Sequence, residues 1–319
     1  MTERPVVALI DAEAARFAEV LADLPVTLRS YAAPTPPGDP ALASIPYALA
    51  APDRLAAYLP ALPALRWAQS TWAGVNPLLP LLPSRPELQV SALKGPFGAL
   101  MVRYLNFWLD GFEQGLLVAL AAQRRARWTH GAVRRQSGRD VRGARAVVLG
   151  TGAIGMDLGA ALTARGYHAV GLNRSGAPAP GFAEVTPIAR RLAALAGAEV
   201  LVSVVPATAE TAGLLDDEAL AELAPGALLM NVGRGSVVQE AALLAALERG
   251  HLGAAVLDVF DAEPLPEDHA FWGAPRCFVT PHISAPTEWE AVVPLFRENL
   301  RKVLAGEPPT GLVDPGRGY

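Results

Sequence analysis

The sequence is poor in cysteine and has no excess of positive charge, and each shortage excludes a class of site. Among its 319 residues Cys277 is the single cysteine, which excludes an internal disulfide and a cysteine-based zinc site. We therefore predict no metal, and a reducing, cytoplasmic setting. The net charge of −4 offers no basic surface, so we expect no nucleic-acid partner.

Long hydrophobic runs are also lacking. No stretch of about 18 uninterrupted apolar residues occurs, so we expect no membrane span. The first residues include acids and lack the apolar core of a signal peptide, so we expect no cleaved leader. The hydrophobic fraction is nevertheless 51%, which allows sizeable cores, and a length of 319 residues favours two domains.

What the chain does contain is two series in which short apolar segments alternate with helix-forming ones. The first series predicts strands at 5–11, 46–50, 65–70 and 88–93, and helices near 12–23 and 52–60. The second predicts strands at 145–149, 168–172, 199–204, 227–232, 253–257 and 277–280, and a last helix at about 287–305. This alternation is typical of α/β folds with parallel sheets.

The region between the two series has a different pattern. Residues 98–125 are mostly apolar and contain no proline, which predicts a long helix. Residues 126–145 are polar and basic and contain glycine. They have two interpretations, a solvated surface loop or an arm that contacts a partner.

A glycine motif follows the strand predicted at 145–149. Gly150, Gly152 and Gly155 form G-x-G-x-x-G, and a helix-forming run begins there with Ala153 and Ile154. The glycines allow a tight turn, close approach to a pyrophosphate and close packing of helix on strand. The start of the helix attracts phosphate through its free N–H groups. We therefore predict a dinucleotide-binding site.

The residues after the next strand bear on the choice of dinucleotide. An acid about 20 residues after the first glycine would bind the ribose 2′-hydroxyl of NAD, but Asn173 occupies that place. Arg174 and Ser175 follow, and a guanidinium and a hydroxyl can bind a 2′-phosphate. We predict that NADPH is preferred and that NADH remains possible. The alternative is a surface arginine that makes no cofactor contact.

Three later segments end apolar strands with polar groups. Arg234 lies between two glycines after the strand at 227–232, Asp258 and Glu263 follow the next strand, and His282 follows the last. Ligands of doubly wound sheets bind at the carboxyl ends of the strands, so we expect these groups to converge.

This set of groups suits the reduction of a 2-keto acid. Hydride addition to a ketone requires a proton donor, and a histidine such as His282 titrates in the right range. A carboxylate beside the imidazole, here Glu263, favours its protonated form. Arg234 can hold the substrate carboxylate and polarise the keto oxygen. The remaining histidines are expected to have ordinary structural roles: His130, His168, His251 and His269.

The ordered motifs GTGAIG, VVPATAET, MNVGRG, LDVFDAEPLP and TPHISAPT resemble the D-isomer-specific 2-hydroxyacid dehydrogenase family over nearly the whole chain. The absent acid after the second strand and the ending VDPGRGY are most similar to its glyoxylate/hydroxypyruvate reductase A branch. The resemblance implies two Rossmann-like doubly wound parallel-sheet domains. It implies a flavodoxin-like substrate domain from 1–97 and 286–319, an inserted dinucleotide-binding domain at 98–285, and a homodimer formed through 98–142.

The resemblance also implies roles for single residues. Arg234 corresponds to the substrate-binding arginine, Glu263 to the carboxylate partner and His282 to the acid/base. Asp258 corresponds to the acid that holds the nicotinamide carboxamide. Further cofactor contacts are expected from Val205, Pro206, Thr211, Val232 and Ser284, and substrate contacts from Trp72, Ala73 and Gly74.

The predicted function is therefore NADPH-dependent reduction of a small 2-keto acid of the glyoxylate or hydroxypyruvate type. Two alternatives stay open, a dinucleotide-sensing regulatory protein of the same fold and a dehydrogenase for another 2-hydroxy acid. The chain departs from the related branch in two places. Ala50 and Ala51 stand where a tryptophan is typical, and Arg103 stands where many relatives carry an acid. Both departures concern the identity of the substrate.

Overall fold

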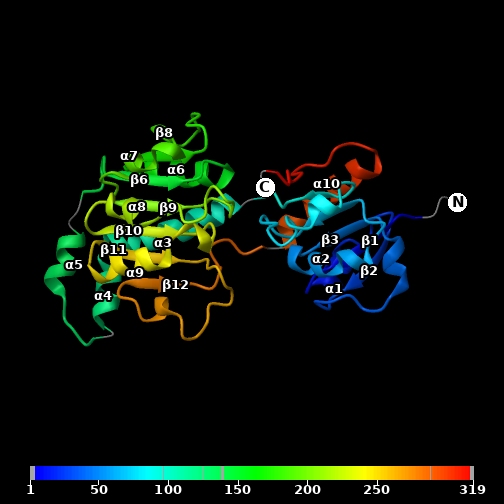
Figure 1. Cartoon of the computed structure of the whole chain (residues 1–319), viewed down its shortest axis with the longest axis horizontal. Helices are drawn as coiled ribbons and strands as arrows, with labels where there is room; N and C mark the ends of the chain where they lie inside the picture. Colours follow the sequence, from blue (N-terminus) through cyan, green and yellow to red (C-terminus); the bar gives the residue numbers. More distant parts are fainter. Residues whose placement is uncertain (1–3, 96, 124, 138–139, 288, 317–319) are drawn as a thin grey trace. The chain divides into compact units, whose positions relative to one another are not determined.

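The computed structural model describes residues 4–95, 97–123, 125–137, 140–287 and 289–316, and its contacts divide the chain into two units (Figure 1). Unit 1 comprises Met1–Pro96 and Thr287–Tyr319, and unit 2 comprises Phe97–Pro286. Each unit contains one sheet, and all strand pairs in both sheets are parallel. The predicted α/β class with two parallel-sheet domains is confirmed.

The sheet of unit 1 has the order β2-β1-β3-β4-β5, which is the flavodoxin-like order. Its strands are β1 (Val6–Ile10), β2 (Thr27–Tyr31), β3 (Tyr47–Ala50), β4 (Trp67–Ser70) and β5 (Gln89–Ser91). The sequence pattern did not predict β2. This strand lies at the edge of the sheet and is largely solvent-facing, so it lacks the apolar run by which the other strands were recognised.

Helices cover both faces of this sheet. They are α1 (Ala14–Val20), α2 (Pro52–Tyr58) and α10 (Trp289–Leu304). The α2 residues Leu55 and Tyr58 belong to a core cluster on one face, whereas Trp67 stacks on Phe296 of α10 with ring centroids 5.9 Å apart. The buried amide of Asn299 donates to Gln69 Oε1 at 2.8 Å. The C-terminal helix is therefore an integral part of the unit formed by the N-terminal strands.

The sheet of unit 2 has the order β12-β11-β10-β9-β6-β7-β8. Its strands are β6 (Arg145–Leu149), β7 (His168–Asn173), β8 (Glu184–Pro187), β9 (Val200–Ser203), β10 (Ala227–Asn231), β11 (Leu252–Leu257) and β12 (Cys277–Val279). The chain moves outward in one direction from β6 to β8 and in the other from β9 to β12. This reversal is the Rossmann arrangement, in which ligands bind at the carboxyl ends of the strands beside the reversal. The short edge strand β8 was not predicted.

Two core clusters lie on opposite faces of this sheet. Neighbouring residues of β6 alternate between them, because side chains of a strand point to opposite faces in turn. Val147 packs with α7 (Arg191–Leu195), α8 (Asp217–Ala221) and α9 (Glu240–Glu248). Val148 packs in the other cluster, which includes Leu109 and Leu158 and therefore the helices α3 and α6 (Ala153–Ala164).

The prediction of one continuous helix over 98–125 is wrong. The structure has two helices there, α3 (Phe97–Glu113) and α4 (Leu116–Gln123), separated at Gly115 with φ 70°. A Cβ on Gly115 would lie 2.9 Å from the carbonyl oxygen of Val133, so only glycine permits this contact. Val133 belongs to α5 (His130–Ser137), which corrects the interpretation of 126–145 as a loop. Residues 124, 138 and 139 of this region lie outside the described residues.

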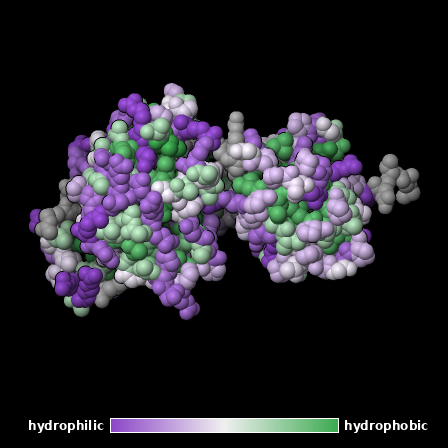
Figure 2. Space-filling model, viewed as in Figure 1, coloured by the Kyte–Doolittle hydropathy of each residue, from purple (hydrophilic) through white to green (hydrophobic). Residues whose placement is uncertain are grey.

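On each unit, hydrophilic residues make up much of the visible surface, and smaller hydrophobic areas are interspersed among them (Figure 2). Large apolar side chains such as Trp67 and Phe296 are instead fully buried. Within the described ranges, no helix combines the length and the hydrophobicity needed to cross a membrane.

Candidate functional site

The predicted site residues of unit 2 occupy loops at the carboxyl ends of its parallel strands. Because β6 lies between β9 and β7, the reversal of the chain places the loops after these strands side by side. The loops after β10, β11 and β12 continue the same edge of the sheet. The sheet therefore gathers the glycine motif, the residues after β7 and the three polar segments on a single edge.

The glycine motif forms the turn between β6 and α6. Gly150 has φ 106°, and a Cβ on Gly155 would lie 1.9 Å from the Gly150 carbonyl oxygen, so neither position tolerates a side chain. Gly152 is different, because a Cβ there would meet nothing within 4 Å. It is the N-cap of α6, and no side chain caps that helix. The first N–H groups of α6 thus face open space and suit a phosphate group.

Asn173 lies at the end of β7, as predicted, and its side chain holds the following turn. The amide nitrogen donates to Thr151 Oγ1 and to the Ala177 carbonyl oxygen, each at 2.9 Å. The amide oxygen accepts from the N–H groups of Ser175 at 3.2 Å and Gly176 at 2.6 Å. All four hydrogen-bonding positions of the amide are therefore used. In this conformation Asn173 fixes the position of Arg174 and ties the turn to the glycine motif.

The loop after β9 is also held from within. Thr211 is 6% exposed, and its hydroxyl donates to the Pro206 carbonyl oxygen at 2.6 Å and accepts from Thr208 N–H at 2.9 Å. Its neighbour Glu210 forms an ion pair with Arg174, with 3.0 Å between Nη2 and Oε2. The ion pair joins the loop after β9 to the loop after β7.

His282 and Glu263 form a hydrogen-bonded pair, as the sequence predicted. Nδ1 of His282 lies 2.8 Å from Oε2 of Glu263. The other carboxylate oxygen accepts from Phe260 N–H at 2.9 Å, which fixes the orientation of the carboxylate. When Nδ1 carries a proton toward Glu263, Nε2 is the nitrogen that can exchange a proton with a ligand. The pair is partly exposed, with relative side-chain areas of 50% for His282 and 36% for Glu263.

The backbone of His282 is in the left-handed region, with φ 53°, and buried Asp258 stabilises this turn. Asp258 accepts from Ile283 N–H at 2.9 Å, from Ser284 N–H at 2.8 Å and from the Thr280 hydroxyl at 2.5 Å. Left-handed conformations of ordinary residues are costly and persist where the surroundings enforce them. The carboxylate predicted to touch the nicotinamide therefore also shapes the loop that presents His282.

A further hydroxyl extends this network. Tyr104 of α3 lies with its hydroxyl 2.7 Å from Thr280 Oγ1. Because Thr280 donates its own proton to Asp258, Tyr104 is the donor in that contact. Burial raises the pKa of Tyr104, so its proton is retained at neutral pH.

The turn after β10 places Arg234 near enough to Glu263 for their charges to interact. Asn231 donates to the Arg234 carbonyl oxygen at 2.8 Å, and Arg234 Nη1 donates to the carbonyl oxygen of Gly233 at 2.6 Å. Burial lowers the pKa of the guanidinium, and the charge of Glu263 opposes that shift. No carboxylate among the described residues forms an ion pair with Arg234. A cation that is partly desolvated and lacks such a partner suits an anionic ligand.

The predicted substrate loop belongs to unit 1 and follows β4. The Ser70 hydroxyl donates to the Trp72 carbonyl oxygen at 2.8 Å and accepts from Trp72 N–H at 3.0 Å. Within the described ranges, no acceptor takes a hydrogen bond from the N–H groups of Ala73 and Gly74. Trp72 itself is 40% exposed.

The residues at which the chain departs from the related branch lie in different units. Ala50 and Ala51 are both buried, at the end of β3 and the start of α2. Arg103 lies on the exposed side of α3.

Sequence reasoning did not identify four residues that organise this edge of the sheet. Thr151 and Thr280 lie inside motifs that were recognised, and Glu210 lies in the VVPATAET segment. Tyr104 is far from any motif, and no local signal marks it. The four act through hydrogen bonds or ion pairs with residues distant in sequence. Only the fold brings those partners together.

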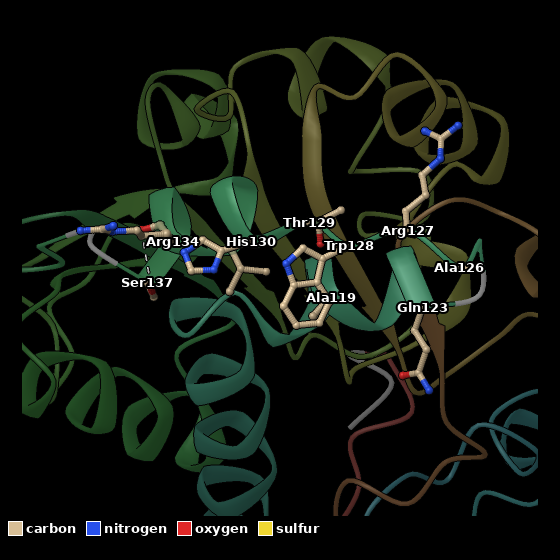
Figure 3. Close-up of a pocket in the computed structure, with 10 residues that line it drawn as sticks. Ala119, Gln123, Ala126, Arg127, Trp128, Thr129, His130, Arg134 and Ser137 are labelled. Atoms are coloured by element: carbon tan, nitrogen blue, oxygen red, sulfur yellow. Dashed lines mark hydrogen bonds between the residues drawn. The ribbon is translucent and has the colours of Figure 1, made fainter.

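A cavity lies elsewhere in unit 2. Its volume is about 820 Å³, and it is formed by α4, α5 and the segment between them. Figure 3 shows Trp128, Thr129 and His130 among the side chains that line it. None of the predicted site residues lines this cavity. In the described part of the chain, no cluster of three or more His, Cys, Asp or Glu residues could hold a metal ion.

Comparison with known proteins gives concordant results. Residues 114–284 match the family model described as D-isomer specific 2-hydroxyacid dehydrogenase, NAD binding domain. A glyoxylate/hydroxypyruvate reductase A from Serratia proteamaculans is 42% identical over 172 residues, which are 54% of this chain and 55% of that protein. The match thus spans about half the length of this curated relative.

Two solved structures match over nearly the full length. A D-isomer specific 2-hydroxyacid dehydrogenase family protein from Aeromonas salmonicida is 32% identical, with a TM-score of 0.84 and coverage of 98% of this chain and 100% of that one. A D-isomer specific 2-hydroxyacid dehydrogenase from Xanthobacter autotrophicus, in complex with NADPH and MES, is 30% identical, with a TM-score of 0.83 and coverage of 99% and 100%.

Proposed function

Because the chain belongs to the D-isomer specific 2-hydroxyacid dehydrogenase family, we propose that it reduces a small 2-keto acid to the 2-hydroxy acid with NADPH. The His282–Glu263 pair carries this proposal, because it lies on the same edge of the sheet as the glycine motif and near Arg234. The similarity to glyoxylate/hydroxypyruvate reductase A supports glyoxylate or hydroxypyruvate as the substrate.

The residues of the site suit the binding of a dinucleotide. The uncapped start of α6 and the open space at Gly152 would receive the pyrophosphate. Arg174 would pair with a 2′-phosphate, and the last residue of β7 is Asn173, where an acid would repel that phosphate. When bound there, NADPH would supply the hydride for the keto carbon. The NADPH complex of the Xanthobacter relative supports this choice of cofactor.

The protein groups perform the remaining chemistry. Nε2 of His282 donates a proton to the substrate oxygen as negative charge develops there. Glu263 holds Nδ1 and stabilises the imidazolium that precedes this transfer. Arg234 binds the substrate carboxylate and polarises the keto oxygen. The substrate contacts of Trp72, Ala73 and Gly74, which belong to unit 1, stay a prediction.

The test is turnover of a keto-acid panel, including glyoxylate and hydroxypyruvate, with NADPH and with NADH, followed as loss of nicotinamide absorbance. We expect turnover with NADPH to exceed turnover with NADH. His282→Asn should lower kcat by about 10²- to 10⁴-fold, the usual contribution of a general acid. Binding of NADPH, followed by quenching of tryptophan fluorescence, should change little. Full activity of this variant would disprove the role of His282.

A second histidine pair provides a matched control. His269 lies 3.3 Å from Glu240 in the same unit, but its Nδ1 accepts from Phe271 N–H and supports a turn. His269→Asn should therefore keep kcat within about threefold of the parent, since no proton-transfer role is lost. Absence of turnover on every keto acid, with cofactor binding intact, would instead favour a dinucleotide sensor.

We also propose that the protein is a homodimer in which a second copy covers the cavity formed by α4 and α5. Trp128 at this cavity is 93% exposed, and the neighbouring helices expose Phe107 and Leu116 at 63% and 46%. Large apolar side chains exposed on neighbouring elements favour an interaction site. Sedimentation should give twice the chain mass of 33.4 kDa, and Trp128→Glu should lower it. Trp272→Glu is the control, because Trp272 is 48% exposed elsewhere.

The cytoplasmic location stays a prediction. Cell fractionation would test it.

A further inference from the structure

The ion pair between Arg174 and Glu210 connects two loops at the carboxyl edge of unit 2. Arg174 follows β7 and Glu210 follows β9, and these strands are the two neighbours of β6 in the sheet. The pair therefore reaches across the end of β6, where the glycine motif begins. Its two charged groups are 3.0 Å apart and 58% and 65% exposed. An ion pair in this place is available to solvent and to any ligand of the glycine motif.

Hydrogen bonds hold the backbone that carries each residue of the ion pair. The turn that carries Arg174 is held by the four hydrogen bonds of Asn173. The loop that carries Glu210 is held by the buried hydroxyl of Thr211, which bonds to Pro206 and Thr208. The two charges are thus brought together by the backbone and do not depend on long mobile loops.

A carboxylate beside Arg174 alters what this arginine can bind. A 2′-phosphate has to replace Glu210 as the partner of the guanidinium, and it approaches against the negative charge of Glu210. A 2′-hydroxyl carries no such charge. The end of β7 lacks the acid that would disfavour a 2′-phosphate. The loop after β9 contributes an acid in its place, because Glu210 is distant in sequence but lies 3.0 Å from Arg174.

We propose that Glu210 is a specificity-determining residue that limits the preference for 2′-phosphorylated dinucleotides by competing for Arg174. This inference rests on the proposed function, since it takes Arg174 as the partner of the 2′-phosphate. Because the pair is exposed, the effect is modest and is screened by salt.

The test measures equilibrium binding of NADPH, NADH and adenosine 2′,5′-bisphosphate by titration calorimetry at low and high salt. Glu210→Gln should tighten NADPH and the bisphosphate by about threefold at low salt, the scale of an exposed ion pair. NADH should change by less than about twofold, and the gain should shrink at high salt. In the double variant with Arg174→Ala the gain should vanish, because the residue for which Glu210 competes is gone.

Glu184→Gln is the matched control. It removes the same charge from an ion pair with Arg145, in which Nη2 and Oε1 are 2.9 Å apart. Glu184 and Arg145 are the first residues of β8 and β6, so this ion pair lies at the amino ends of the strands, away from the glycine motif. It should leave all three affinities unchanged. Equal tightening of NADPH and NADH, or no tightening by Glu210→Gln, overturns the inference while the reductase function stands. A parent protein that binds neither dinucleotide overturns both.

Discussion

The first turn of each sheet shows how two similar topologies acquire different abilities. In unit 2 the turn after β6 contains Gly150 and Gly152, and α6 begins without a side-chain cap. In unit 1 the turn after β1 contains Asp11. One oxygen of this carboxylate accepts from Glu13 N–H at 3.0 Å, and the other accepts from the Thr71 hydroxyl at 3.0 Å. Neither α1 nor α6 has a side-chain cap. The turn before the helix nevertheless contains a carboxylate in unit 1, whereas in unit 2 a Cβ on Gly152 would meet nothing within 4 Å.

This difference explains why a parallel sheet alone does not predict a dinucleotide site. In both units a helix follows the first strand along the chain, β1 or β6, and its dipole favours negative charge at its start. In unit 1 the carboxylate of Asp11 lies in the turn before α1 and accepts from the N–H of the N-cap residue Glu13. In unit 2 the turn before α6 contains no carboxylate. The side chains of the turn therefore decide which unit can bind phosphate.

The largest effect is expected when a carboxylate is placed at the start of α6. Gly152→Asp places a carboxylate at the N-cap of α6, where a Cβ meets nothing and the φ of −70° suits aspartate. The variant should fold with an unchanged or slightly raised thermal midpoint. Its Kd for NADPH should rise by about 100-fold or more, because the carboxylate repels and displaces the phosphate. Calorimetric titration and thermal unfolding measure the two properties.

A neighbouring glycine distinguishes loss of the ligand from loss of the fold. Gly155→Ala forces a Cβ to within 1.9 Å of the Gly150 carbonyl oxygen. It should destabilise the protein by about 1–3 kcal/mol, as overpacking does. If Gly152→Asp lowers the midpoint as much as Gly155→Ala does, the open-cap interpretation is wrong.

The reverse change in unit 1 should affect stability and leave cofactor binding intact. Asp11→Ala removes two hydrogen bonds and should cost about 1–2 kcal/mol in the free energy of unfolding. The measurement is a denaturant titration, with NADPH affinity followed in parallel. Thr71→Val removes one of the same bonds, so the double variant should lose less than the sum of the single losses. Strict additivity would contradict the contact.

The smallest effect concerns α8, a helix of unit 2 that has a side-chain cap at its start. Asp216 accepts from Ala219 N–H at 2.8 Å, and this bond, with Arg191 nearby, lowers the pKa of Asp216. A lowered pKa stabilises the fold above the ordinary aspartate value, and that contribution is lost as the pH falls from about 4 through the folded pKa. Asp216→Asn should cost less than about 1 kcal/mol at pH 7 and remove this part of the acid dependence. An unchanged acid titration in the variant would contradict it.

Much of the fold was predictable because strong local patterns mark its central elements. The buried strands β6 and β10 and the glycine turn have sequence signatures that depend on few neighbours. The edge strands β2 and β8 were missed because an edge strand needs fewer apolar residues. The break at Gly115 was missed because its cause is the backbone of α5, which no local pattern near Gly115 reveals.

The candidate site, like the fold, was predictable only where local sequence patterns mark it. The sequence by itself determined the types and order of the chemical groups, among them the glycine turn, Arg234 and His282. The tertiary structure alone decided which groups are already bonded within the protein. Asn173 uses its whole amide on its own turn and on Thr151 of the glycine motif, and Glu210 reaches Arg174 from another loop. The physical reason is that hydrogen bonds and ion pairs act over a few ångströms, and only the folded chain brings distant residues that close.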